Sequence, residues 1–170
     1  METLKEAVAD PSLSKYGFQR GLPRYRQAIS GWLARRFGAD VDPDLEVLPV
    51  IGSKEAIALA AFAVLDPGDS VLIPDPGYAP YFGGGYFAGA DVIRFRLRPE
   101  EGFLIPPDAI RRARGRLRMV YLNYPNNPTS AVAEASYLEE VVEACRERGA
   151  VFLFDNAYSE ITFDGFRAPG

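Results

Sequence analysis

Apolar residues form five short runs along the chain, each bounded by glycine, proline, aspartate or asparagine. Short runs of apolar and β-branched residues between such turn signals are typical of strands. Four of the five are apolar almost throughout, which is typical of strands covered on both faces of a parallel sheet. The predicted strands are Val47–Ile51, Ser70–Pro74, Asp91–Leu97, Met119–Asn123 and Val151–Asp155.

The run Asp91–Leu97 has a different pattern, because Ile93 and Phe95 alternate with Arg94 and Arg96. Successive side chains of a strand point to opposite faces of the sheet, so alternation indicates one buried and one solvated face. We therefore expect this strand near an edge of the sheet.

Three segments carry apolar residues at the three- and four-residue spacing of a helix. Pro23 near the start and Gly38 just beyond the end bound the first of them. Ser53 is a good N-cap for the second, and Ser136 with Glu139 forms a candidate capping box for the third. The predicted helices are Leu22–Phe37, Lys54–Leu65 and Tyr137–Cys145.

The alternation of strands and helices predicts an α/β fold with a mainly parallel sheet sandwiched by helices. No repeat, low-complexity tract or linker interrupts the pattern, so residues 1–170 are predicted to belong to one domain. A glycine-rich loop that binds a dinucleotide directly follows a strand, whereas the segment Gly83-Gly84-Gly85 follows an aromatic segment. We interpret it as a flexible or closely packed segment between a helix and a strand.

The composition limits the kinds of partner. The 170 residues include 23 acidic and 19 basic side chains, for a formal net charge of −4, and this mild acidity argues against a nucleic-acid partner. The basic run Arg111–Arg118 is expected to solvate a helix end and a loop. The longest strongly apolar run, Ala56–Leu65, is too short to span a bilayer, and the charged N-terminus lacks the apolar core of a signal peptide. We expect no membrane partner and a cytoplasmic location.

Histidine is absent, and Cys145 is the single cysteine. These counts exclude a Ser–His or Cys–His catalytic arrangement, a histidine-containing metal site and an internal disulfide, and no metal site is expected. Cys145 lies on an apolar helical stripe, which favours a core position.

Polar, turn-forming and aromatic residues follow four of the five predicted strands. Ligands of parallel α/β sheets bind beyond the carboxyl ends of the strands, so these residues predict a binding site. The four motifs are Gly52-Ser53-Lys54-Glu55, Asp75-Pro76-Gly77-Tyr78, Asn126-Asn127-Pro128-Thr129 and Asp155-Asn156-Ala157-Tyr158.

Gly52 and Ser53 precede a predicted helix, where free backbone N–H groups, a hydroxyl and the positive end of the helix dipole suit a phosphate. A plain serine N-cap is the alternative. Lys54 opposes the helix dipole, which favours the anion site.

The other motif residues also have two interpretations each. Asp155 either caps a turn or faces a cation such as a protonated ring nitrogen, since an unpaired carboxylate at the end of an apolar strand is costly. Tyr78 either packs in the core or stacks on a planar ring. Asn127 and Tyr158 are either turn and packing residues or hydrogen-bond donors to a ligand oxygen.

Taken with Tyr16-Gly17 and Gly21-Leu22, these motifs resemble, in order and spacing and over essentially the whole chain, the class I/II aminotransferases. Those enzymes are fold-type I proteins that depend on pyridoxal 5′-phosphate (PLP), and they are homodimers with shared active sites. The resemblance implies that Asp155 pairs with the protonated ring nitrogen, so that the ring can accept electrons from the substrate. It assigns the remaining contacts as follows: Tyr78 stacks on the ring, Asn127 and Tyr158 bind the phenolic oxygen, Gly52, Ser53 and Lys54 hold the phosphate, and Tyr16 reaches the phosphate of the neighbouring subunit.

The chain departs from the family pattern in two ways. Ser130 stands where the family has glycine after Asn-Pro-Thr. Family members are also more than twice as long, and their Schiff-base lysine follows the Asp-x-x-Tyr motif within a Ser-x-x-Lys pattern that none of Lys5, Lys15 and Lys54 matches. The resemblance therefore implies a fragment of the large PLP-binding domain without that lysine or the small domain. No catalytic residue is expected in these 170 residues, which alone are predicted to be inactive and marginally stable or prone to aggregate.

The implied reaction is the transfer of an amino group from an amino acid to a 2-oxo acid. A PLP-dependent C–S lyase of the same fold type is one alternative, and a non-catalytic remnant or regulatory module that binds PLP or phosphate is another. The sequences of the motifs Gly52-Ser53-Lys54-Glu55 and Asp75-Pro76-Gly77-Tyr78 resemble most those of aminotransferases for LL-diaminopimelate or aspartate.

Overall fold

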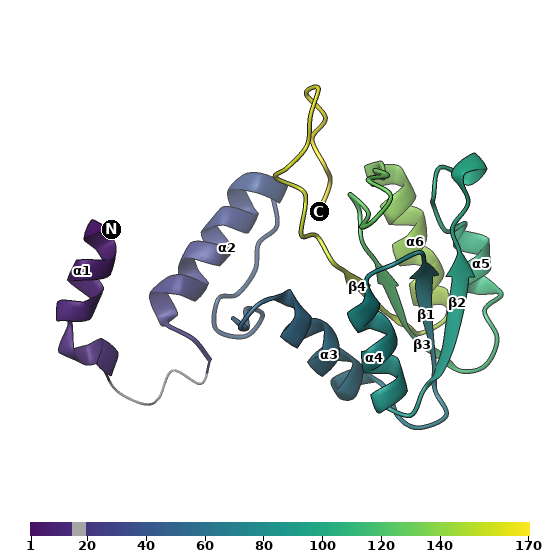
Figure 1. The fold of residues 1–170 in the computed structure, drawn as a ribbon, viewed down its shortest axis with the longest axis horizontal. Coiled ribbons are helices and arrows are strands. Elements are labelled where there is room, and N and C mark those ends of the chain that lie inside the picture. The colour runs from purple at the N-terminus through teal and green to yellow at the C-terminus, as the bar shows by residue number, and fades with distance from the viewer. Residues whose placement is uncertain (15–19) are drawn as a thin grey trace. The chain divides into compact units, whose positions relative to one another are not determined.

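The computed structural model describes residues 1–14 and 20–170, which form two compact units, Met1–Pro49 and Val50–Gly170 (Figure 1). The first unit contains the helix α1 (Glu2–Ala9), the short 3₁₀ helix η1 (Pro11–Ser14) and the helix α2 (Pro23–Phe37). The bounds of α2 confirm the prediction, with Pro23 in the first turn and Gly38 at the C-cap with φ +71°. The sequence reasoning did not anticipate α1.

Arg26 on α2 is buried and organises the first unit. Its guanidinium donates hydrogen bonds to the carbonyl oxygens of Arg20, Gly21 and Pro43, and it pairs with the carboxylate of Asp44. A buried cation is tolerated only when it is paired and hydrogen-bonded, and these contacts provide both. Arg26 thereby fixes the segments on either side of α2 against that helix.

The predicted strand Val47–Ile51 is wrong. The segment forms no strand, and Leu48 and Ile51 are 67% and 94% exposed. A strand requires a neighbour for its backbone hydrogen bonds, and none of the described strands pairs with this segment. Its apolar content alone was therefore not sufficient for a strand.

The second unit is built on a four-stranded parallel sheet with the order β2-β1-β3-β4. The four strands coincide with the remaining predicted runs, and each observed bound lies within two residues of the predicted one. Their bounds are Ser70–Asp75 for β1, Asp91–Arg96 for β2, Leu117–Leu122 for β3 and Val151–Phe154 for β4.

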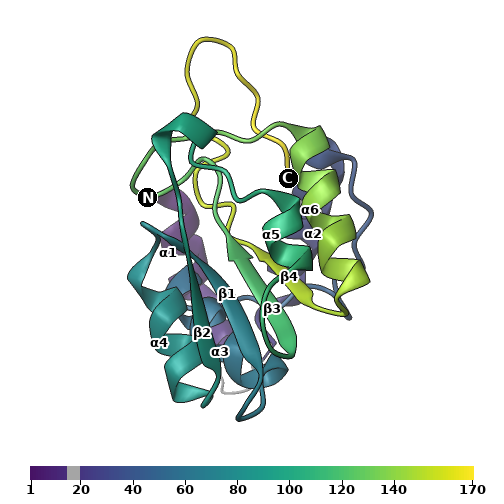
Figure 2. The same cartoon turned by 90° about the vertical axis from the view of Figure 1, so that its right-hand side faces the viewer.

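Helices cover both faces of the sheet, as predicted (Figure 2). The helices α3 (Ser53–Val64) and α4 (Ala79–Phe87) pack on one face, and α5 (Pro107–Arg111) and α6 (Ala135–Glu147) on the other, while η2 (Pro99–Glu101) lies in the connection after β2. Side chains of β1 alternate between the two cores, with Val71 and Ile73 towards α3 and α4 and Leu72 towards α5 and α6. Within the described residues, no helix is both long and apolar enough to cross a bilayer.

The two outer strands are less covered than the central ones. β2 lies at one edge, and its exposed positions include Arg94 and Arg96, which confirms the prediction from their alternation. β4 was expected to be covered on both faces, but it is the other edge of the described sheet and Val151 is 45% exposed. Its apolar sequence resembles that of a central strand although it has only one described neighbour.

The three consecutive glycines lie inside α4 and not between a helix and a strand, and Gly84 and Gly85 are closely packed. A Cβ atom on Gly84 would lie 3.0 Å from the Cβ of Ala61 on α3. On Gly85 it would lie 2.9 Å from Val71 Cγ1 and 3.0 Å from Val92 Cγ2. Glycine at these two positions lets α4 approach both α3 and the sheet.

The predicted helix caps differ from those observed. Gly52, with φ +80°, is the N-cap of α3, and Ser53 is its first residue. The carboxylate of Glu55 accepts a hydrogen bond of 2.7 Å from the N–H of Ile51, so a side chain of the first turn fixes the chain before the helix.

The capping box predicted at Ser136 and Glu139 is wrong, since α6 begins at Ala135 after Glu134 and no side chain caps it. Because α6 begins one residue before Ser136, that hydroxyl lies inside the helix.

The remaining sequence features lie as expected. Cys145 is buried in the core between α6 and the sheet. The arginines of the run Arg111–Arg118 surround the end of α5 and the loop before β3, and several pair with acidic side chains of the same unit: Arg111 with Glu147, Arg114 with Asp91 and Arg116 with Asp69.

Candidate active site

A cavity of about 80 Å³ lies where the loops after β1, β3 and β4 meet the start of α3. The carboxyl ends of parallel strands point the same way, so residues distant in sequence converge there. Five of the predicted site residues are among those that line it. The lining residues are Ser53, Tyr78, Asn123, Asn127, Asp155, Ala157 and Tyr158.

Tyr78 reaches the cavity through a turn that only glycine permits. A Cβ atom at Gly77 would lie 2.3 Å from the carbonyl oxygen of Pro74, a contact that no side chain can make without moving the backbone. The turn delivers Tyr78 to the N-cap position of α4, where it is half-buried with its ring at the cavity wall. The motif Asp75-Pro76-Gly77-Tyr78 therefore fixes the position of the Tyr78 backbone, from which the ring extends to the cavity wall.

Asn123 connects the two loops that carry most of the site. It is buried at the end of β3, its Oδ1 accepts a hydrogen bond of 2.7 Å from the N–H of Asn127, and its Nδ2 donates one of 2.6 Å to the carbonyl oxygen of Asp155. Sequence reasoning counted Asn123 as a strand residue and missed this role. The available signal was an asparagine at the end of an otherwise apolar strand, because a buried amide needs hydrogen-bond partners.

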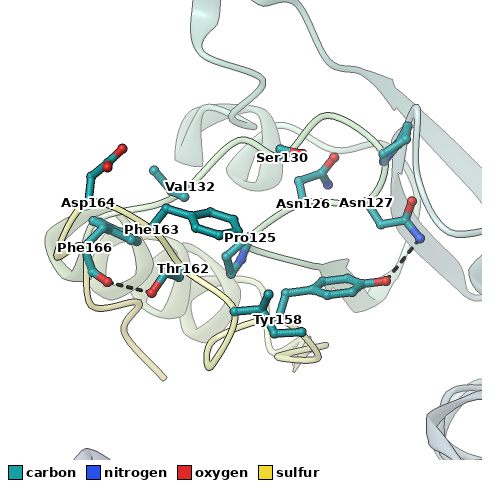
Figure 3. Close-up of a pocket in the computed structure, with 12 residues that line it drawn as sticks. Pro125, Asn126, Asn127, Ser130, Val132, Tyr158, Thr162, Phe163, Asp164 and Phe166 are labelled. Carbon is teal, nitrogen blue, oxygen red and sulfur yellow. Dashed lines mark hydrogen bonds between the residues drawn. The ribbon is translucent and has the colours of Figure 1, made fainter.

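The side chains of Asn127 and Tyr158 lie side by side (Figure 3). The Nδ2 of Asn127 donates a long hydrogen bond of 3.5 Å to the Tyr158 hydroxyl, and both side chains are partly exposed. Since the hydroxyl accepts this bond, its own hydrogen remains able to point towards a ligand. The pair thus offers an amide N–H and a phenolic O–H on one side of the cavity.

Asp155 supplies the charge of the site. Its N–H bonds to the carbonyl oxygen of Leu122 at 2.8 Å, which holds it beside the end of β3. Its Oδ2 accepts a hydrogen bond of 2.7 Å from the hydroxyl of Tyr81, a residue that sequence reasoning did not single out. Within residues 1–14 and 20–170, no arginine or lysine forms an ion pair with this carboxylate. A half-buried carboxylate without a cation from the protein suits a cationic group on a ligand.

Tyr81 is fully buried, and this burial raises the pKa of its hydroxyl far above the ordinary value. The hydrogen bond to Asp155 raises that pKa further, because the carboxylate disfavours a second negative charge beside it. The hydroxyl therefore keeps its proton and is the donor of this hydrogen bond.

The predicted phosphate-binding residues lie around the start of α3. Gly52, Ser53 and Lys54 are all exposed, but only Ser53 lines the cavity. The helix N-terminus and the Ser53 hydroxyl therefore adjoin the site, whereas Lys54 lies in the first turn of α3 and does not line the cavity. Tyr16 lies outside the described residues.

A larger cavity of about 670 Å³ adjoins the first and shares Asn127 and Tyr158 with it (Figure 3). The wall opposite the Asn-Asn-Pro-Thr loop comes from Ile161–Phe166, where sequence reasoning placed no site residue. Ser130, which replaces the family's glycine, also lines this cavity and has φ +60°, in the left-handed region that favours glycine.

The groups around the smaller cavity match the chemical groups of PLP. A carboxylate suits a protonated ring nitrogen, an aromatic ring suits stacking, and an amide with a phenol suits the phenolic oxygen. A helix N-terminus with a hydroxyl suits the phosphate. The donor and acceptor set therefore fits the cofactor that the sequence resemblance implies.

Comparison with known proteins identifies the family of the chain. The sequence profile described as "Aminotransferase class I and II" matches residues 1–169. LL-diaminopimelate aminotransferases from Desulforudis audaxviator and Moorella thermoacetica are each 44% identical over 174 residues and align with 99% of this chain. The solved structure of N-succinyldiaminopimelate aminotransferase from Mycobacterium tuberculosis, 34% identical, superposes on 99% of the chain with a TM-score of 0.90.

The match is to part of each relative. The chain spans 43% of the Desulforudis protein, 44% of the Moorella protein and 44% of the Mycobacterium chain, so it covers less than half the length of these relatives. Within that span, the superposition confirms the predicted α/β fold of fold-type I aminotransferases. The match of the family profile over residues 1–169 shows that the chain belongs to the class I and II aminotransferases.

Proposed function

We propose that the protein carrying this chain is a PLP-dependent aminotransferase, which transfers an amino group from an amino acid to a 2-oxo acid. The observation that supports this most strongly is the grouping of Asp155 with Ser53, Tyr78, Asn127 and Tyr158 around one cavity. The five side chains come from four separate segments of the chain, and only Asp155 and Tyr158 share one. Their convergence is therefore a property of the fold.

Each residue has one task towards the cofactor. Asp155 keeps the ring nitrogen protonated, Tyr78 lies against the ring, and Asn127 with Tyr158 donates hydrogen bonds to the phenolic oxygen. Ser53 and the start of α3 bind the phosphate, together with Gly52 and Lys54. When bound, PLP supplies an electron-withdrawing ring that accepts negative charge from the substrate.

We propose further that residues 1–170 are part of the large PLP-binding domain. The lysine that holds the cofactor covalently then lies outside this chain, and none of the 170 residues is proposed as catalytic. In the full protein, a homodimer would bring Tyr16 of one subunit to the phosphate held by the other. A cytoplasmic location stays a prediction.

The substrates are proposed to be small amino acids and 2-oxo acids. The names of the two relatives described above make LL-diaminopimelate the amino donor to assay first, with a panel of 2-oxo acids as acceptors.

The test is an amino-transfer assay on the protein as its gene encodes it, supplied with PLP. We expect transfer that depends on a 2-oxo acid, and we expect Asp155→Asn to reduce it about 100-fold or more, since that change removes one partner of a charge pair shielded from water. Glu139→Gln, which removes one exposed charge from α6, is the matched control and should leave the rate unchanged.

Two outcomes would contradict the proposal. Release of pyruvate from cystathionine without any 2-oxo acid would identify a C–S lyase instead. Failure to bind PLP at micromolar concentrations would leave a domain of the aminotransferase fold without its chemistry.

A further inference from the structure

Tyr81 contacts the predicted site from within the protein core. It lies in the first turn of α4, is 0% exposed, and does not line either cavity beside Asp155. Its hydroxyl nevertheless donates the 2.7 Å hydrogen bond to Asp155 Oδ2 across 74 positions of sequence. Within the described part of the chain, the side chain that donates a hydrogen bond to this carboxylate is that of Tyr81. The bond is made to Oδ2, so Oδ1 is left for a ligand.

The ring of Tyr81 is held on two sides. It stacks on Tyr121 of β3, with ring centroids 4.8 Å apart and planes inclined by 17°. It also meets the ring of Tyr78 edge to face at 5.7 Å and 81°. A ring packed in this way cannot follow a moving carboxylate, so the hydroxyl marks a fixed point to which Asp155 is oriented.

The hydroxyl binds Asp155 without adding a charge. It donates its hydrogen to Oδ2 and is itself neutral, whereas an arginine or lysine in its place would form an ion pair with the carboxylate. The site therefore keeps its negative charge for a cationic group on a ligand.

We propose that Tyr81 is a positioning residue that turns the ionised carboxylate of Asp155 towards the ring nitrogen of the cofactor. The inference rests on the proposed function, because it assumes that a pyridine ring occupies the cavity. Tyr78, three residues earlier, contacts both that cavity and the ring of Tyr81. One turn of α4 therefore sets both the aromatic wall of the site and the direction of its negative charge.

The test compares two tyrosine-to-phenylalanine variants of the protein as its gene encodes it. Tyr81→Phe removes the hydroxyl that bonds Asp155. Tyr121→Phe is the matched control, because Tyr121 is equally buried in the same stacked pair but its hydroxyl donates to the carbonyl oxygen of Ile57 at 2.9 Å, away from the site. Both variants lose one buried hydroxyl, so a general loss of stability affects them alike.

Two probes separate positioning from a purely structural role. Pyridoxamine 5′-phosphate carries an amine in place of the aldehyde of PLP and binds without a covalent link, so its dissociation constant reports the noncovalent contacts. Its 1-deaza analogue has C–H in place of the ring nitrogen and offers nothing for Asp155 to pair with. The ratio of the two dissociation constants is internal to each variant and does not depend on how much of the sample is folded.

We expect Tyr81→Phe to weaken binding of pyridoxamine 5′-phosphate about tenfold, the size of one lost hydrogen bond to a charged group, and to leave the deaza analogue within about twofold. Tyr121→Phe should change neither constant by more than about twofold. Equal weakening of both probes by Tyr81→Phe, or equal behaviour of the two variants, would overturn the positioning role while leaving the proposed function intact. If the unaltered protein binds neither probe, the proposed function fails and this inference fails with it.

Discussion

Replacing Gly85 by alanine tests how closely α4 must approach the sheet, and Gly83 on the same helix provides the matched control. In an ordinary helix interior, alanine makes the helix more stable than glycine does by about 1 kcal/mol, and this gain applies at both positions. At Gly83 the nearest atom to a new Cβ is Phe87 Cε2 at 3.9 Å, an ordinary contact. We therefore expect Gly83→Ala to stabilise the protein by about 0.5–1 kcal/mol.

At Gly85 the new methyl group would lie 2.9 Å from Val71 Cγ1 and 3.0 Å from Val92 Cγ2. Optimal carbon–carbon contacts lie at about 3.5–4.0 Å, so the methyl overlaps two side chains by roughly half an ångström each. Both neighbours are valines on strands, whose branched side chains rotate with difficulty. Overpacking of this kind costs about 1–3 kcal/mol.

The helix propensity is the same for the two variants, so their difference isolates the packing cost. We expect Gly85→Ala to be less stable than Gly83→Ala by about 1–3 kcal/mol, measured as the shift in urea midpoint at unchanged m-value in the protein as its gene encodes it. Equal midpoints for the two variants would refute the close approach of α4 to the strands β1 and β2, and with it the placement of Tyr78 and Tyr81.

Four further predictions concern single positions or the chain as a whole. Ser130→Gly should raise stability by about 0.5–1 kcal/mol in a thermal melt, because it relieves a left-handed φ of +60°, whereas Ser130→Ala should bring no gain. Asn123→Ala should lower the unfolding free energy by about 2 kcal/mol in denaturant titrations, since it leaves partly buried backbone groups of Asn127 and Asp155 without these partners. Burial raises the pKa of the Cys145 thiol to about 11. At pH 8 only about one thiol in a thousand is then ionised, so a chromogenic disulfide reagent should label Cys145 after unfolding and not before. The 170-residue chain alone should elute as aggregates in size-exclusion chromatography, because large apolar side chains are exposed on α3 and the segment before it, and a monodisperse sample with a sharp two-state melt would contradict this. The exposed side chains are Ile51, Leu59 and Phe62.

Features set by neighbouring residues could be predicted from the sequence. The turns after β1 and β3 contain proline, glycine and asparagine, whose backbone preferences act locally, so both turns and the site beyond them were expected. The edge position of β2 followed from the alternation of Arg94 and Arg96 with apolar residues. The sandwich of helices followed from the order of the elements, because parallel strands require crossover connections.

Features that depend on distant partners could not be predicted. The apolar run Val47–Ile51 reads as a strand, but whether it forms one depends on a neighbouring strand that the run itself does not specify. Tyr81 is one aromatic residue among several between Tyr78 and Phe87, and nothing in that segment reveals that its hydroxyl bonds Asp155. Asn123 is similar, since its partner Asp155 becomes a neighbour only when β3 and β4 pair.

The two edge strands of the sheet differ in their side chains, and this difference determines at which edge a further strand pairs more readily. β2 presents Arg94 and Arg96 at its edge, and charged side chains on an outer strand discourage another strand from pairing there. β4 carries only Val151, Phe152, Leu153 and Phe154, and within the described residues it pairs with β3 alone. Pairing of a further strand is therefore favoured beside β4, next to Asp155, where that strand would form a new wall of the site.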